Sequence, residues 1–205
     1  MSPSKLVLFG SLIFSLPLFA QQGTSGFTVN KIDVALQTTP DFGVSGYGKR
    51  VRRAGTWLEV EATFDWTPLK PDQKFLEEIT VNYFILLKLP TVESPRGTLL
   101  SGSSVHTLVS AGRDKKSVVY VAPRVLEKLF DGRVPSTVNA MVAGVGVELV
   151  VGGQVVAEQT TQGRGAWWRE EVFKPVTGLV LDKSKTPFAH LAWDYYEPLK
   201  PQGTN

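Results

Sequence analysis

Apolar and polar residues alternate most strictly between Trp57 and Trp66. The apolar positions of this segment are Leu58, Val60, Ala62, Phe64 and Trp66. Successive side chains of a strand point to opposite sides, so this alternation predicts a strand with one buried face. A helix would scatter the same residues around its circumference. The intervening Glu59 and Glu61 are expected on the opposite, solvated face of the strand.

Shorter segments of the same kind follow along the chain. Strands are predicted at residues 27–38, 78–89, 105–111, 117–122, 138–151 and 154–161, with further candidates at 167–173 and 177–181. The segment 78–89 is apolar on both faces in its second half, which is typical of a strand covered on both sides. Residues 112–115 are predicted to form a turn, and Gly152-Gly153 is a strong hairpin signal.

One segment has helical rather than strand spacing. Pro123 is suited to the first position of a helix, and a single apolar stripe runs from Val125 to Phe130. Asp131-Gly132 is expected to end this short helix.

Taken together, these elements predict an all-β protein with an immunoglobulin-like antiparallel β-sandwich, one short helix and an extended C-terminal tail. Thirteen prolines and nineteen glycines suit short strands joined by tight turns. We expect one sandwich domain at 21–181 and an aromatic-rich tail at 182–205. Two small domains are the alternative.

The first twenty residues are typical of a secretory signal peptide. Lys5 precedes an uncharged apolar run, Pro17 ends that run, and Ala20 precedes a predicted cleavage site at Gln21. The alternative is an uncleaved anchor, although the run is shorter than the about 20 apolar residues that span a membrane. We expect an exported protein located in the periplasm, at the outer membrane or on the cell surface.

Residue types that carry catalysis or metal binding are sparse. The chain has no cysteine, which excludes disulfides, thiol catalysis and Cys-ligated metals. His106 and His190 stand alone, outside any metal-binding spacing, and are expected to be packing or surface residues. No nucleophile elbow or phosphate-binding loop occurs. We therefore expect no enzyme, cofactor or metal site, and the net charge of +3 gives no argument for nucleic acid.

Two segments before the tail are candidates for binding. A basic run follows a glycine-rich stretch and contains Lys49, Arg50, Arg52 and Arg53. It would pair with anionic lipid headgroups or acidic glycan, unless it is a solvated hairpin tip that protects an edge strand. Trp167 and Trp168 would face opposite ways on a strand, one in the core and the other exposed or stacked under an arginine. A glycan platform is the functional alternative for this pair.

The tail itself is unusually rich in large apolar side chains. They are Phe188, Leu191, Trp193, Tyr195 and Tyr196, and we include the last three among the candidate binding residues. So much apolar surface is not expected to stay bare in a monomer. The tail either packs on its own domain or pairs with a sheet edge of a neighbouring subunit.

Several segments resemble a known family. They are Trp-Leu-Glu-Val-Glu at 57–61, Val-Tyr-Val-Ala-Pro-Arg-Val-Leu-Glu at 119–127, Val-Val-Gly-Gly at 150–153 and Pro-Phe-Ala-His-Leu-Ala-Trp-Asp-Tyr-Tyr at 187–196. With the signal peptide, they resemble small exported bacterial proteins of immunoglobulin-like fold that are encoded with type IV pilus or secretin genes. The leader is not that of a type IV pilin, in which a charged leader precedes a long hydrophobic helix.

The resemblance implies an accessory or surface component and supplies no catalytic or ligand residues. The expected function is that of a non-enzymatic structural or interaction protein of the cell envelope, associated with a pilus or secretin system. Its expected partners are envelope or pilus proteins, or a second copy of the chain. The alternative is a module that binds envelope glycan or anionic lipid.

Overall fold

The computed structural model of the chain describes residues 26–42, 54–89, 96–163 and 165–201. The predicted signal peptide lies outside these residues, and so do four of the candidate binding residues, Lys49, Arg50, Arg52 and Arg53. No helix in the described part of the chain is long and apolar enough to cross a membrane.

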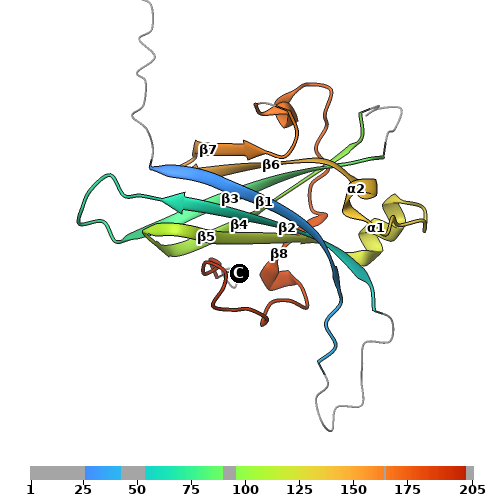
Figure 1. Cartoon of the computed structure of the whole chain (residues 1–205), viewed down its shortest axis with the longest axis horizontal. Coiled ribbons are helices and arrows are strands. Elements are labelled where there is room, and N and C mark those ends of the chain that lie inside the picture. The colour runs from blue at the N-terminus through green and yellow to red at the C-terminus, as the bar shows by residue number, and fades with distance from the viewer. Residues whose placement is uncertain (1–25, 43–53, 90–95, 164, 202–205) are drawn as a thin grey trace, which may run out of the picture.

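Two antiparallel four-stranded sheets face each other (Figure 1). The first contains, in spatial order, β1 (Phe27–Thr38), β2 (Thr56–Trp66), β5 (Gly112–Val121) and β8 (Val180–Asp182). The second contains β4 (Thr98–Ser110), β3 (Phe75–Leu87), β6 (Val142–Val151) and β7 (Gln154–Thr160). The order β1-β2-β5 opposite β4-β3-β6-β7 is that of an immunoglobulin-type sandwich, so the predicted fold class is confirmed.

The core between the sheets follows from the alternation in β2. The four apolar positions from Leu58 to Phe64 have no exposed area, and Trp66 is almost fully buried. They pack against β3 residues such as Ile79 and Ile85. Leu86 and Leu87 at the end of β3 are both buried, because Trp168 and its neighbours cover the outer side of this strand. The prediction that the second half of β3 is covered on both faces is therefore confirmed.

Two local predictions from turn and helix signals are confirmed. Helix α1 (Pro123–Leu129) begins with proline at its first turn, and Asp131 and Gly132 follow with φ of 49° and 74°. The hairpin between β6 and β7 turns at Gly152 and Gly153, whose φ values of 58° and 78° match the type I′ turn.

Three local predictions are wrong. Residues 112–115 belong to β5 rather than to a turn, and Ala111 alone separates β4 from β5. Residues 138–141 form a second short helix, α2 (Val138–Met141), before β6 begins. The predicted strand at 167–173 is instead a 3-10 turn at Trp167–Arg169, which follows two glycines with positive φ.

The C-terminal part of the chain packs on its own domain, where it covers β5 and one edge of β4. Strand β8 pairs with β5 and lies so close to β4 that a Cβ on Gly102 would come within 2.6 Å of Val180. Beyond β8, the tail runs below β5 in the view of Figure 1. It reaches β4, where the Thr107 N–H donates to the Pro198 carbonyl at 3.0 Å and the Lys200 N–H to the Val105 carbonyl at 2.8 Å.

Candidate functional site

The tail covers a polar strip on the outer side of β2 and β5. Glu61 Oε1 accepts a hydrogen bond from Lys116 Nζ at 2.9 Å, and Oε2 accepts one from the Tyr196 hydroxyl at 3.0 Å. The Glu61 and Lys116 side chains are only 12% and 19% exposed. Glu59 is half-buried and accepts from Gln37 Nε2 at 3.0 Å. The expectation that both glutamates are solvated is therefore wrong, because the tail and neighbouring polar side chains cover this face.

An aromatic cluster holds the start of the tail. The Phe188 ring stacks on Tyr120 with centroids 4.6 Å apart and meets Trp57 edge-on at 5.7 Å. Phe188 is buried, which matches the expectation that tail residues cover apolar surface. Burying a side chain of this size stabilises the docked tail by about 1.5–3 kcal/mol.

His106 of β4 ties the tail to the core. Its Nδ1 lies 3.0 Å from the Glu197 carbonyl oxygen, and its Nε2 lies 2.7 Å from Ser117 Oγ. Because a carbonyl oxygen only accepts hydrogen bonds, Nδ1 carries the proton and Nε2 accepts from the serine hydroxyl. Burial lowers the pKa of His106 to about 4. His106 is thus a neutral, fully hydrogen-bonded packing residue.

A cavity of about 350 Å³ lies between the tail and β4–β5. Its lining includes His106, Lys183, His190, Trp193 and Tyr196. The pattern of apolar and polar positions gave no signal for such a cavity, because its walls come from β4, β5 and two separate parts of the tail.

Lys183 is the unusual residue of this cavity. It is 6% exposed, and its Nζ donates to the Ala189 carbonyl at 3.3 Å and lies 5.1 Å from the centre of the Tyr196 ring. No carboxylate of the described residues lies within 4.0 Å of Nζ, whereas Lys185 pairs with Asp182 at 3.0 Å. Burial lowers the pKa of Lys183. Sequence reasoning missed Lys183, because nothing in Asp-Lys-Ser-Lys distinguishes it from Lys185.

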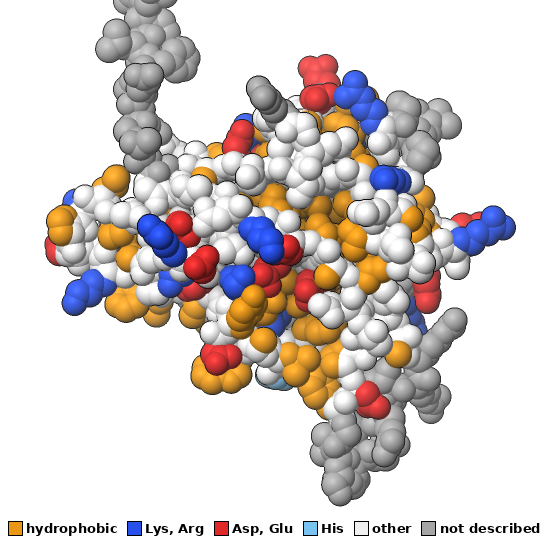
Figure 2. All heavy atoms as spheres, viewed as in Figure 1, with side chains coloured by type: hydrophobic (Ala, Val, Ile, Leu, Met, Phe, Trp, Pro, Cys, Tyr) orange, Lys and Arg blue, Asp and Glu red, His pale blue; other side chains and the backbone are white. Residues whose placement is uncertain are grey.

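The tail also presents large apolar side chains to solvent, including Trp193 of the cavity lining. Trp193 is 78% exposed, Tyr195 50% and Leu191 38%. The Tyr195 ring meets Tyr196 edge-on at 5.0 Å and lies 4.8 Å from Lys116 Nζ. Figure 2 shows hydrophobic side chains gathered along the lower side of the molecule, where Figure 1 has the C-terminal segment. Within the chain, Phe188 is thus covered as expected, whereas Trp193 is not, and whether a neighbouring subunit covers Trp193 stays a prediction.

Trp167 and Trp168 lie on the second sheet, away from the tail. Trp168 is buried, stacks on Phe84 with centroids 5.3 Å apart and donates from Nε1 to Glu148 at 2.7 Å. Trp167 is half-buried and donates to Thr160 Oγ1 at 2.7 Å. The two indoles do not face opposite ways, because in the 3-10 turn their rings meet edge-on at 5.5 Å.

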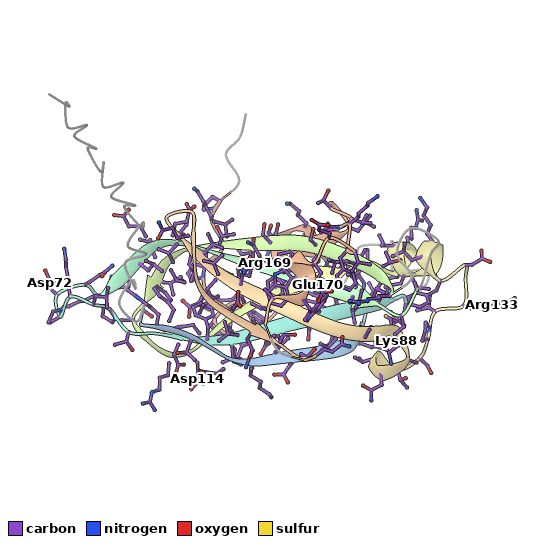
Figure 3. All side chains as sticks on the ribbon, turned by 90° about the horizontal axis from the view of Figure 1, so that it is seen from above. Asp72, Lys88, Asp114, Arg133, Arg169 and Glu170 are labelled. Carbon is purple, nitrogen blue, oxygen red and sulfur yellow. The ribbon has the colours of Figure 1, made fainter. Side chains whose placement is uncertain are left out.

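Arg169 completes this second cluster. Its guanidinium donates to Glu148 at 2.6 Å and to Glu158 at 2.9 Å, and it lies 6.0 Å from the Trp168 ring. Figure 3 labels Arg169 beside Glu170, which pairs with Arg96 at 2.7 Å. Trp168 is therefore the core residue of the pair. It also carries the arginine, which the sequence led us to expect on the other, exposed tryptophan. Its position argues for packing rather than for a glycan platform.

Comparison with known proteins places the chain in a family. A protein-family model matches residues 19–202. The chain belongs to that family. Three chains of solved structures also match. One is a crystal structure of a protein from Akkermansia muciniphila, which is 18% identical, has a TM-score of 0.73, and is matched over 86% of this chain and 94% of its own. At this identity the similarity shows a shared fold. No curated protein matches.

Proposed function

We propose that this protein is a non-enzymatic structural or interaction component of the cell envelope, an accessory to a pilus or secretin system that binds other proteins through its tail. The observation that carries the proposal is the 78% exposure of Trp193 on a tail that is itself firmly docked. Tryptophan and tyrosine dominate the binding energy of protein interfaces, and a preorganised support lowers the entropic cost of binding.

The support beneath Trp193 is well defined. Phe188 on one side is buried against Tyr120, and Tyr196 on the other donates to Glu61. Between them Ala192 adopts φ of 46°, a left-handed conformation that costs a residue with a Cβ roughly 1–2 kcal/mol. Such strain persists only where the surroundings impose it, and it is found most often at functional sites. Here it lies immediately before the exposed indole.

The location in the envelope and the link to a pilus or secretin system rest on the sequence. The predicted signal peptide supports export, and the resemblance of the segments at 57–61, 119–127, 150–153 and 187–196 supports the association. The immunoglobulin-type sandwich is compatible with both, since this architecture is common among cell-surface domains.

Binding of envelope glycan or anionic lipid is the second candidate function. The exposed Trp193 and Tyr195 suit a glycan as well as a protein. The basic run with Lys49 and Arg50 lies outside the described residues, and Trp168 is buried. Because Trp168 is buried, the described surface does not present the tryptophan pair as a glycan platform, and protein binding stays our first proposal.

Photo-crosslinking in the native host tests the proposal. A photoreactive amino acid replaces Trp193 in one strain and Leu69 in another, because Leu69 is equally exposed, at 79%, on the loop between β2 and β3. We expect envelope proteins to crosslink at position 193 and not at position 69. Equal crosslinking at both positions would contradict a specific surface at the tail.

Export is tested separately in the same strains. We expect the protein in the envelope fraction, with a mature N-terminus near Gln21. A cytoplasmic protein that retains Met1 would remove the envelope proposal, whatever the crosslinking shows.

A further inference from the structure

Lys183 combines burial with the lack of a counter-charge. An ammonium group has three N–H donors, and lysine is almost never fully buried unless it is paired. In the described part of the chain Lys183 Nζ makes one long hydrogen bond, to the Ala189 carbonyl, and one contact with the face of Tyr196. Both are weaker than an ion pair with a carboxylate.

The acidic residues near Lys183 in the tail are committed to other lysines. Asp182 pairs with Lys185 at 3.0 Å, and Glu197 lies 3.6 Å from Lys115. Burial lowers the pKa of Lys183, and no acidic neighbour among the described residues offsets this effect. The fold therefore holds one positive charge at the wall of the cavity without neutralising it.

The size and walls of the cavity suit a small organic molecule that contains a ring. Its volume of about 350 Å³ lies at the lower end of the range for small-molecule sites, which is about 300–1,000 Å³. Val118 and Leu199 give it apolar walls, and Trp193 and Tyr196 add aromatic ones. Glu197 also lines the cavity, but its carboxylate lies 3.6 Å from Lys115 Nζ, so Lys183 is the charged lining residue that lacks an ion-pair partner among the described residues. Apolar and aromatic walls with a few placed polar or charged groups are typical of sites that bind small ligands.

We propose that the cavity between the tail and β4–β5 binds a small carboxylate-bearing molecule, with its carboxylate on Lys183 and its ring against Trp193 and Tyr196. A single ammonium matches a single carboxylate, whereas a phosphate dianion is usually met by an arginine fork or several donors. Uronic acids and aromatic carboxylic acids share this chemistry. The site does not depend on any role in a pilus or secretin system, and it is tested with the purified protein alone.

Calorimetric titration of the mature chain tests the site with matched probes. Glucuronate and 4-hydroxybenzoate carry the carboxylate and a ring, glucose and 4-hydroxybenzyl alcohol lack the charge, and acetate lacks the ring. We expect binding of at least one ring-bearing carboxylate, and at least tenfold weaker binding of its uncharged counterpart and of acetate. Preference for glucuronate would identify an acidic sugar, and preference for 4-hydroxybenzoate an aromatic acid. No binding of either at millimolar concentration would overturn the proposal.

Substitutions then assign the binding to Lys183. Lys183→Met keeps the length of the side chain and should weaken binding of the carboxylate at least tenfold, whereas Lys185→Met, at the lysine already paired with Asp182, should leave it unchanged. Trp193→Ala, at a largely exposed side chain, should weaken binding without lowering the melting temperature. Undiminished binding in Lys183→Met, or equal loss in Lys185→Met, would overturn the assignment to Lys183. Undiminished binding in Trp193→Ala would overturn the contact between the ring and Trp193.

Discussion

The Nδ1 atom of His106 lies 3.0 Å from the carbonyl oxygen of Glu197, a residue 91 positions later in the chain. This contact joins the middle of β4 to the backbone of the tail. It requires a neutral imidazole with its proton on Nδ1, because Nε2 accepts from Ser117. Protonation of His106 would therefore break the hydrogen bond with Ser117 and place a charge in a buried position.

The stability of the protein should depend on pH through His106. Its pKa is about 4 in the folded state against about 6.5 in the unfolded chain, so between these values the unfolded state binds more protons. The contribution of neutral His106 is complete above pH 6.5 and is lost as the pH falls towards 4, by about 3 kcal/mol in all. Urea unfolding from pH 7 to pH 4 measures this loss. His106→Gln, which cannot titrate, should show a shallower decline, and an equal decline would contradict the assignment.

Because the tail covers Glu61, this residue should contribute measurably to the free energy of unfolding. Glu61→Ala leaves Lys116 and the Tyr196 hydroxyl without their carboxylate, so we expect a loss of about 1–3 kcal/mol. Lys31→Ala, which removes an exposed ion pair with Asp33, should stay within about 0.5 kcal/mol. Chemical denaturation of both variants decides this, and equal small losses would mean that the tail does not cover β2 in solution.

Phe64 tests whether the buried face of β2 is assigned correctly. Its side chain has no exposed area, so Phe64→Ala should cost about 3–5 kcal/mol in the free energy of unfolding. A loss below about 1 kcal/mol in chemical denaturation would show that the register of β2 differs from the one described.

Removal of the tail after Asp182 should destabilise the monomer. The truncation deletes Phe188 and Tyr196 and exposes Tyr120 and His106, so we expect a loss of several kcal/mol at every protein concentration. Thermal melts at two concentrations, together with light scattering, measure the effect. A truncated chain that melts like the full-length protein but loses self-association would instead indicate a tail that pairs between subunits.

The packing of Trp168 on β6 is tested at Gly146. A Cβ at this position would come within 2.1 Å of the Trp168 ring, so Gly146→Ala should cost about 1–3 kcal/mol or more. The cost should fall in a Trp168→Leu background, where the smaller side chain leaves room. A double-mutant cycle measured by denaturation gives this coupling, and purely additive losses would contradict the close contact.

The sequence carried enough information for the elements whose signals are local. The alternation in β2 predicted its buried face, because every second side chain of this strand points into the core between the two sheets. Gly152-Gly153 predicted a turn that depends on those two residues alone. The signal at Gly112–Lys115 was also local, but it was misleading. There Asp114, with φ of 56°, and a shift of register between Phe64 and Trp66 let β5 continue through turn-forming residues.

The site could not be predicted because distant segments define it. The environment of Glu61 depends on Tyr196, 135 positions later, and a pattern within β2 contains no trace of that partner. Trp168 lies in a 3-10 turn rather than in a strand, and its indole donates a hydrogen bond to Glu148 on β6, which is distant in the sequence. Lys183 differs from Lys185 only through the short 3-10 turn Lys183–Lys185 and the tail that folds over it.

The close pairing of the tail with β4 has a kinetic consequence. One edge of β4 is bound to β3, and the other is occupied at Leu99–Ser101 by Val176 and at Val105–Thr107 by Pro198 and Lys200. A strand from another molecule can reach this edge only after the chain's own segments leave it. Any assembly that used the edge would begin with a first-order release of the tail. Its rate would therefore stop rising with protein concentration once that release became limiting.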